Sequence, residues 1–186
     1  MARVHSFGPI ENRSARILIL GSMPGQASLA AGQYYAHPQN AFWRIIAELL
    51  HFDAASPYAL RAQALKTARI ALWDVLRSCK RKGSLDAMIE RDAQVANDFS
   101  MFFRAHSKIT HVYFNGAKAE ACFKRHLPRG IGGGAIACTR LPSTSPANAS
   151  MPFERKLDAW RVILCAGPPV SRTVPRRRQA SPLPGR

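Results

Sequence analysis

The segment from residue 21 to residue 43, GSMPGQASLAAGQYYAHPQNAFW, concentrates residue types that can hold a substrate. Glycine and proline on both sides of Met23 predict a close turn with outward-facing backbone N–H groups. Successive N–H groups of this kind can bind a phosphate or the edge of an extruded nucleobase. The segment therefore predicts a ligand-binding turn formed by Ser22, Met23, Pro24 and Gly25.

Asn40 closes the run HPQN and comes two residues before the Phe-Trp pair that opens a helical pattern. Asparagine is a favoured N-cap, so capping is one interpretation of Asn40. The other is that its carboxamide faces a substrate, where it can orient a water molecule or stabilise developing charge. Tyr35, five residues upstream, either packs in the core or stacks on a flat ligand. The residues themselves leave both pairs of interpretations open.

Polar residues also follow three further apolar runs. Asp74 ends RIALWD, Asn115 ends THVYFN before Gly116, and AIACTRL leads into PSTSP. A carboxylate accepts hydrogen bonds, an amide donates and accepts, and serine hydroxyls can donate to phosphate oxygens. Each has a structural alternative, because Asp74 and Asn115 can cap the next turn and the serines can form turns.

The elements that must position these residues follow from hydrophobic periodicity. β-rich apolar runs predict strands at residues 16–20, 69–74, 110–115 and 135–141, and helical spacing marks residues 40–52, 58–68, 93–106, 117–126 and 153–164. This alternation favours an α/β fold, a three-layer α/β/α sandwich with a central, mostly parallel four-stranded sheet. Ligands bind outside the carboxyl ends of such strands, where the polar residues above are expected to meet.

The charge of the chain favours a polyanionic partner. The 186 residues carry a formal net charge of +16, and nearly half of them are hydrophobic, as in a globular protein. Residues 166–186 are rich in Pro, Arg, Gly and Ser, which predicts a basic, disordered tail. Residues 1–165 are predicted to form one domain. Removing the five tail arginines leaves a charge of +11. We therefore expect nucleic acid as the partner of the domain itself.

The four cysteines lie far apart and form no metal-binding pattern, so we expect no metal site and no cofactor. The chain shows neither a signal-peptide pattern nor an apolar run of membrane-spanning length. These features predict a location in the cytoplasm, associated with the nucleoid rather than with a membrane, and we expect a monomer.

Residues 21–43 and 141–148 together resemble the two motifs of the uracil-DNA glycosylase superfamily, in particular the branch with mismatch-specific uracil/thymine glycosylases. Members of that branch carry a Gly-x-Asn-Pro-Gly turn and then an aromatic–His–Pro–x–Asn–x–Phe–Trp run, which HPQNAFW resembles. LPSTSP is similar to the second motif, a Pro-Ser loop that inserts beside the target base. GSMPG with YYAHPQNAFW and LPSTSPAN most resembles the hypoxanthine-DNA glycosylase branch, over about residues 13–165.

The resemblance implies a monofunctional DNA glycosylase of base excision repair. It would extrude a deaminated base, hypoxanthine favoured, from double-stranded DNA and hydrolyse the N-glycosidic bond. Met23 stands where many relatives have a water-activating Asn or Asp, and a thioether cannot replace either. The hypoxanthine branch implies Asn40 as the substitute, and Asn115 is the second catalytic candidate. No lysine is placed by the motifs as a Schiff-base nucleophile, so no strand cleavage is expected.

The resemblance also implies roles for the remaining residues. Tyr35 matches an aromatic residue that stacks on the extruded base. Asp74 matches the base-reading position, where a carboxylate would suit the N1–H of hypoxanthine, and the backbone of residues 22–25 would contact the base edge. The implied DNA contacts are Leu141, Pro142, Ser143, Thr144, Ser145 and Pro146, with Leu141 or an apolar neighbour as the wedge.

Three alternatives remain open at this point. The first keeps the class and changes the base to uracil or mismatched thymine. The second is a catalytically inactive, basic DNA-binding module that uses the same surface. The third is an unrelated α/β enzyme that holds a small phosphorylated ligand in the Gly/Pro turn.

Overall fold

The computed structural model describes residues 3–80, 93–127 and 136–165. Its centre is a four-stranded parallel sheet with the strand order β3-β2-β6-β7. The strands are β2 (Ile17–Gly21), β3 (Ile70–Asp74), β6 (His111–Asn115) and β7 (Ala137–Leu141). The predicted α/β class and the four predicted strands are confirmed.

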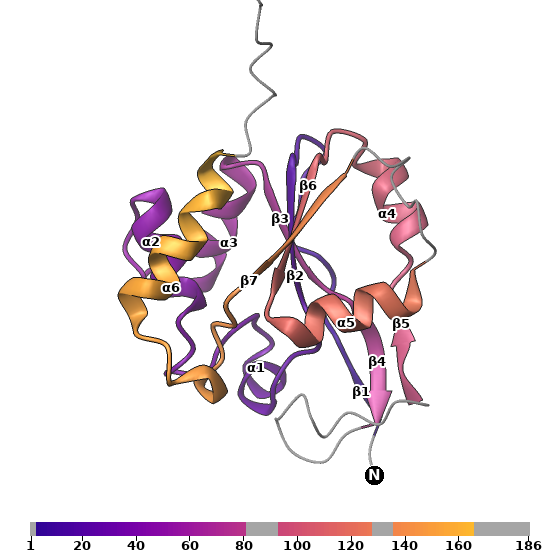
Figure 1. Cartoon of the computed structure of the whole chain (residues 1–186), viewed down its shortest axis with the longest axis horizontal. Helices are drawn as coiled ribbons and strands as arrows, with labels where there is room; N and C mark the ends of the chain where they lie inside the picture. Colours follow the sequence, from indigo (N-terminus) through magenta and orange to yellow (C-terminus); the bar gives the residue numbers. More distant parts are fainter. Residues whose placement is uncertain (1–2, 81–92, 128–135, 166–186) are drawn as a thin grey trace, which may run out of the picture.

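Helices cover both faces of this sheet (Figure 1). One face carries α2 (Phe42–Leu50), α3 (Tyr58–Thr67) and α6 (Phe153–Trp160). The other carries α4 (Phe99–Ala105) and α5 (Ala117–His126). A short helix, α1 (Gln26–Ala31), follows the turn after β2 and is absent from the prediction.

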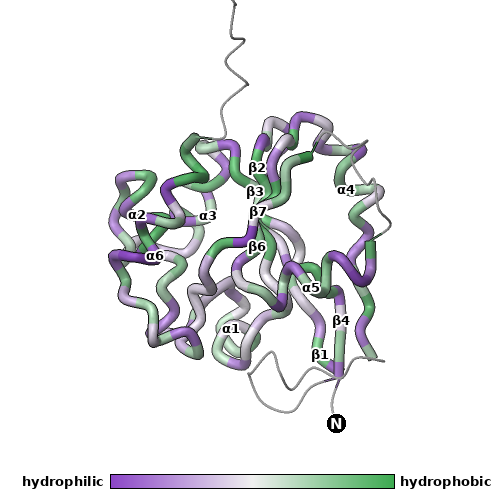
Figure 2. The backbone as a smooth tube through the Cα atoms, viewed as in Figure 1, coloured by the Kyte–Doolittle hydropathy of each residue, from purple (hydrophilic) through white to green (hydrophobic). Residues whose placement is uncertain are grey.

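Strand β2 explains why the sheet needs a layer on each face. All five of its residues are buried. Ile17 and Ile19 pack in a hydrophobic cluster with α2 and α6, whereas Leu18 and Leu20 pack in a second cluster with α4 and α5. Because successive side chains of a strand point to opposite faces, a strand that is apolar throughout requires cover on both. Figure 2 shows this hydrophobic character along β2 and β3 at the centre of the molecule.

A second, three-stranded antiparallel sheet lies beside the α4–α5 layer and is also absent from the prediction (Figure 1). It consists of β1 (Arg3–His5), β4 (Leu76–Lys80) and β5 (Val95–Ala96), with β4 in the middle. The pairing of β5 with β4 corrects the predicted helix at residues 93–106. That helix begins only at Phe99, where the Asp98 carboxylate accepts a hydrogen bond of 2.9 Å from the Met101 N–H.

The C-terminal part of the described chain contains two short 3-10 helices. η3 (Pro146–Asn148) belongs to the loop after β7, and η4 (Arg161–Cys165) takes over directly from α6, so the helix predicted at residues 153–164 changes type after Trp160. The tail predicted at residues 166–186 lies outside the described residues. Among the helices that the structure describes, none has the length and apolarity to cross a membrane.

Candidate active site

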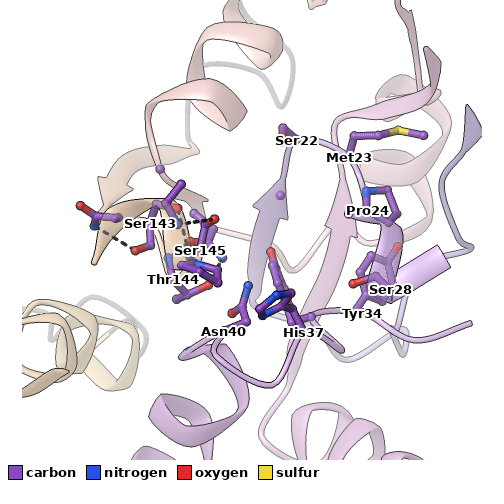
Figure 3. Close-up of a pocket in the computed structure, with 18 of the residues that line it drawn as sticks. Ser22, Met23, Pro24, Ser28, Tyr34, His37, Asn40, Ser143, Thr144 and Ser145 are labelled. Atoms are coloured by element: carbon purple, nitrogen blue, oxygen red, sulfur yellow. Dashed lines mark hydrogen bonds between the residues drawn. The ribbon is translucent and has the colours of Figure 1, made fainter. Parts of the chain in front are cut away.

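The carboxyl ends of the four parallel strands form one row. The strand register pairs Gly21 with Asp74 and Asn115 with Leu141, and Leu20 of β2 lies opposite Phe114 of β6. The polar residues after each strand therefore meet at a single edge, as the sequence predicts. A pocket of about 960 Å³ opens at this edge, and Figure 3 shows residues from three separate chain segments around it.

Each residue that the sequence predicts for the site lines this pocket. From the first half of the chain these are Ser22, Met23, Pro24, Gly25, Tyr35, Asn40 and Asp74. From the second half they are Asn115, Leu141, Pro142, Ser143, Thr144, Ser145 and Pro146. Their common location is a finding, whereas their individual chemical roles stay predictions.

The turn after β2 is held tightly against the end of β3. The N–H of Val75 donates to the Gly21 carbonyl at 2.9 Å, and the N–H of Leu76 donates to the Ser22 carbonyl at 3.1 Å. A Cβ on Gly21 would overlap the Asp74 carboxylate and lie 2.9 Å from the Tyr35 hydroxyl. Residue 21 must therefore be glycine for the carboxylate and the phenol to approach the strand end.

Met23 contributes mainly packing. Its side chain is buried in the hydrophobic cluster that contains Leu20, Val75 and Phe114. Asp74 is also buried, with only 2 % of its surface exposed. The pocket wall here therefore combines backbone groups of the turn with one buried carboxylate.

Asn40 joins the start of α2 to the pocket. Its Oδ1 accepts a hydrogen bond of 2.9 Å from the Phe42 N–H in a local side-chain-to-backbone turn. The N-cap position of α2 is occupied by Ala41, so the predicted N-cap role of Asn40 is corrected to a turn directly before the helix. The Nδ2 group makes no hydrogen bond with any described part of the chain, and Asn40 lines the pocket. This turn uses the amide oxygen and leaves the amide nitrogen available to a ligand.

Thr144 ties together the segments that carry the two motifs. Its N–H donates to Asn115 Oδ1 at 2.8 Å, and its hydroxyl oxygen accepts from Asn115 Nδ2 at 2.8 Å. Its carbonyl accepts from the Ala41 N–H at 3.0 Å, directly beside Asn40. Thr144 itself is 1 % exposed. The Asn115 amide is thus engaged at both ends, which fits a positioning role at the strand end.

Tyr35 adopts the left-handed conformation, with a φ of 55°. Its ring stacks on Phe42 with centroids 4.1 Å apart and planes 28° from parallel. An unfavourable φ in a bulky residue persists only where the surroundings determine it. The neighbouring Tyr34 provides those surroundings.

Tyr34 is buried and held at three points. Its N–H donates to the Tyr58 hydroxyl at 3.1 Å, and its carbonyl accepts from Trp43 Nε1 at 2.8 Å. Its hydroxyl donates toward the carbonyls of Phe7 and Gly8, at 3.2 and 3.1 Å. Burial raises the pKa of Tyr34, and the nearby charge of Asp74 raises this pKa further. The phenol therefore remains a neutral donor, and the backbone before Tyr35 is fixed.

The loop at residues 141–148 is internally hydrogen-bonded. Ser143 Oγ accepts from the Ser145 N–H at 3.2 Å, and Asn148 Nδ2 donates to the Ser143 carbonyl at 3.0 Å. Trp160 Nε1 donates to the Pro142 carbonyl at 3.0 Å, which ties the loop to α6. Turn formation by the serines, left open by the sequence, is confirmed, and their hydroxyl protons remain available to a ligand.

Leu141 does not meet the expectation that it forms an exposed wedge. Its side chain is 4 % exposed and packs in the same hydrophobic cluster as Phe42 and Trp160. The reason is its position as the last residue of β7, where the side chain points into the core rather than toward solvent. Met151, which also lines the pocket, is a partly exposed apolar neighbour.

Several lining residues were not predicted, among them Ser28 and Arg140. Ser28 is buried, and its Oγ accepts from the Ala36 N–H at 3.2 Å. Arg140 is the residue before Leu141, the last residue of β7. It could therefore have been predicted from its position near the carboxyl end of a strand, as Asp74 and Asn115 were. In the described ranges, no three His, Cys, Asp or Glu side chains gather where they could hold a metal ion.

Comparison with known proteins agrees with this geometry. The sequence model of the uracil DNA glycosylase superfamily matches residues 8–164. A hypoxanthine DNA glycosylase of Methanosarcina acetivorans is 34 % identical over 158 residues, which cover 84 % of this chain and 95 % of that protein. A hypoxanthine DNA glycosylase of Methanosarcina barkeri is 40 % identical over 114 residues, 61 % of this chain and 71 % of that protein.

A solved structure shares the fold as well. It is a solution NMR structure from Methanosarcina acetivorans, described provisionally as a uracil DNA glycosylase. The TM-score is 0.72 at 31 % sequence identity, and the match covers 88 % of this chain and 99 % of the other.

Proposed function

The chain belongs to the uracil DNA glycosylase superfamily and is a DNA N-glycosylase, and on that premise we propose that it excises hypoxanthine from double-stranded DNA. The proposal rests mainly on one observation: Asn40 lines the same pocket as the turn at residues 21–25. Met23 in that turn is buried and offers no group that could act on a water molecule. Two relatives named hypoxanthine DNA glycosylase support the same substrate.

Asp74 is the proposed reader of the base. It lies at the carboxyl end of β3 beside the turn at residues 21–25. A carboxylate only accepts hydrogen bonds, and the N1–H of hypoxanthine is a donor where adenine has an acceptor. Backbone N–H groups of the turn would donate to O6. This pairing favours the deaminated purine over adenine.

Asn40 is the proposed catalytic residue. The C1′–N9 bond breaks with its electron pair leaving on the base, and a water oxygen then bonds to C1′ and releases a proton, which the departing base takes up. A carboxamide is not basic at neutral pH, so Asn40 would not abstract a proton. Its Nδ2 would donate a hydrogen bond to the negative charge that develops on the base, and the second lone pair of Oδ1 would accept from the water and orient it. Asn115 would position the Thr144 loop beside it, and a direct catalytic contact from Asn115 remains the alternative.

The product would be an abasic site in an intact strand. Strand cleavage by a glycosylase requires an amine that forms a Schiff base with the sugar. No lysine is found among the described residues that line the pocket. Hydrolysis by water therefore fits the site.

The loop at residues 141–146 would hold the DNA beside the extruded base. Extrusion costs a few kcal/mol, and the cost is lower for a weakly paired deaminated base. Ser143 and Ser145 would donate to phosphate oxygens. Because Leu141 is buried, Met151 is the better candidate to fill the gap that the extruded nucleotide leaves.

Uracil or mismatched thymine is the second candidate substrate. Met23 argues against strong uracil activity, because it offers neither the amide nor the carboxylate that many relatives use at this position. A catalytically inactive binding module would keep the same surface but release no base.

A panel of four duplexes with one sequence tests the proposal. Each contains a single hypoxanthine, uracil, xanthine or G:T mismatch, and alkali reveals the abasic sites. We expect the fastest release from the hypoxanthine duplex and none from an undamaged control. Faster release of uracil would overturn the substrate assignment, and no release from any duplex would overturn the enzymatic function.

A further inference from the structure

Arg140 lies at the rim of the pocket without a role in the proposed chemistry. It is the next-to-last residue of β7, lines the pocket, and 57 % of its side chain is exposed. Its Nη1 lies 3.4 Å from Glu120 Oε2 on α5, and α5 packs beside β7. The guanidinium is thus an exposed cation at the pocket, paired with one carboxylate.

Glu120 holds a second cation as well. Its other oxygen, Oε1, lies 2.7 Å from Lys124 Nζ, one helical turn further along α5. The Glu120 side chain is 21 % exposed, whereas the Lys124 side chain is 69 % exposed. We call these three residues the α5–β7 ion cluster. It carries two positive charges and one negative charge, with both cations open to solvent.

These contacts are suited to exchange with another anion. An ion pair whose cation is exposed to solvent contributes little net stability, so exchanging its anion costs little. A guanidinium can form two parallel hydrogen bonds with a phosphate, and a single 3.4 Å contact to Glu120 leaves most of its donors unused. A phosphodiester beside the pocket could therefore replace Glu120 at modest cost.

From these observations we propose that Arg140 and Lys124 form a DNA-phosphate site beside the pocket, and that Glu120 is the internal anion which the phosphate displaces. The proposal rests on the DNA-glycosylase function and adds a contact surface outside the 141–146 loop. Glu120 then weakens binding to all DNA equally, so that tight binding depends on additional contacts to an extruded base.

The chain supplies a matched control. Arg161 Nε lies 3.2 Å from Asp158 Oδ1, and these side chains are 61 % and 74 % exposed. Like Arg140 and Glu120, they form an arginine–carboxylate pair with an exposed arginine, although Asp158 is more exposed than Glu120, and neither residue lines the pocket. They lie where α6 passes into η4, at the end of the helix farther from the loop after β7 (Figure 1).

The test measures dissociation constants for an undamaged duplex over a range of NaCl concentrations. We expect E120Q to tighten binding several-fold and D158N, which changes the net charge equally, to have little effect. R140Q should weaken binding and lower the slope of log K against log salt by about one unit, as expected for one lost phosphate contact. K124Q should act in the same direction, and R161Q should not.

Equal effects of E120Q and D158N, or an unchanged salt slope in R140Q, would overturn the phosphate site. Melting temperatures of the variants near that of the parent protein exclude misfolding as a cause. Because the duplex is undamaged, this result is independent of base release. A protein that shows the Arg140 and Glu120 effects but excises no base would refute the proposed function alone.

Discussion

At the scale of single residues, Asn40 combines a structural and a chemical role because its side chain has two different ends. The oxygen accepts from the Phe42 N–H at the start of α2. The nitrogen remains available to donate to a ligand in the pocket, which the turn at residues 21–25 also lines (Figure 3). Asn40 thus stabilises the turn before α2, where Ala41 and not Asn40 is the N-cap, and its catalytic role stays a prediction.

Two substitutions of Asn40 separate these roles. Asn40→Ser keeps an oxygen that can accept from the Phe42 N–H, whereas Asn40→Ala removes this hydrogen bond and should lower the free energy of unfolding by about 1 kcal/mol. Both remove Nδ2 and should lower the single-turnover rate of hypoxanthine release by about 100-fold, the usual cost of one lost charge-stabilising donor. Chemical denaturation and single-turnover assays measure the two effects.

The outcome for the serine variant decides the assignment. If Asn40→Ser releases hypoxanthine at the parent rate, Asn40 only stabilises the turn before α2 and the chemistry lies elsewhere in the pocket.

At the scale of elements, the loop after β7 depends on one close backbone approach. Gly116, the residue before α5, has a φ of 93°, and its N–H donates to the Leu141 carbonyl at 3.0 Å. A Cβ at this position would lie 2.8 Å from the Cβ of Ser143. The start of α5 and the proposed phosphate-binding loop are thus in direct contact, and Thr144 then connects this loop to α2.

Gly116→Ala should move this loop. With ψ at 168°, Gly116 lies in a region that essentially only glycine adopts, so a residue with a Cβ costs about 1–3 kcal/mol there, and the contact with Ser143 adds to that cost. We expect a lower melting temperature and, in the variant that remains folded, a several-fold weaker affinity for the hypoxanthine duplex.

Gly32→Ala is the control for backbone strain. Gly32 has a φ of 62° at the end of α1, and a Cβ there would meet nothing within 4 Å. This variant should lose stability without losing DNA affinity. Similar affinity losses in both variants would contradict a specific effect on the Ser143 loop.

At the scale of the whole molecule, the sheet could be predicted because buried parallel strands are apolar throughout. RILIL and the central VYF of THVYFN stand out for that reason. The helices between the strands could be predicted from the helical spacing of their apolar residues. The second sheet could not be predicted, because β1 and β5 have three and two residues and their stability depends on pairing with β4. Val95 and Ala96 also fit a helical pattern, and only their pairing with β4 removes them from α4.

The site was predictable to the extent that topology determines it. Polar residues after parallel strands converge on one edge whatever the details of packing, so Asp74 and Asn115 could be placed together. The burial of Leu141 depends on which face of β7 meets α6, and the anchoring of Tyr34 depends on hydrogen bonds to Trp43 and Tyr58. These long-range contacts leave no local signal in the sequence.

A single-turnover time course on a duplex with one hypoxanthine, analysed with and without alkali, tests directly whether this pocket hydrolyses the N-glycosidic bond. We expect release of free hypoxanthine and an abasic strand that remains intact until alkali is added. A folded, DNA-binding protein that releases no hypoxanthine would contradict the claim that this pocket hydrolyses the N-glycosidic bond. Strand cleavage before alkali would contradict hydrolysis by water as its mechanism.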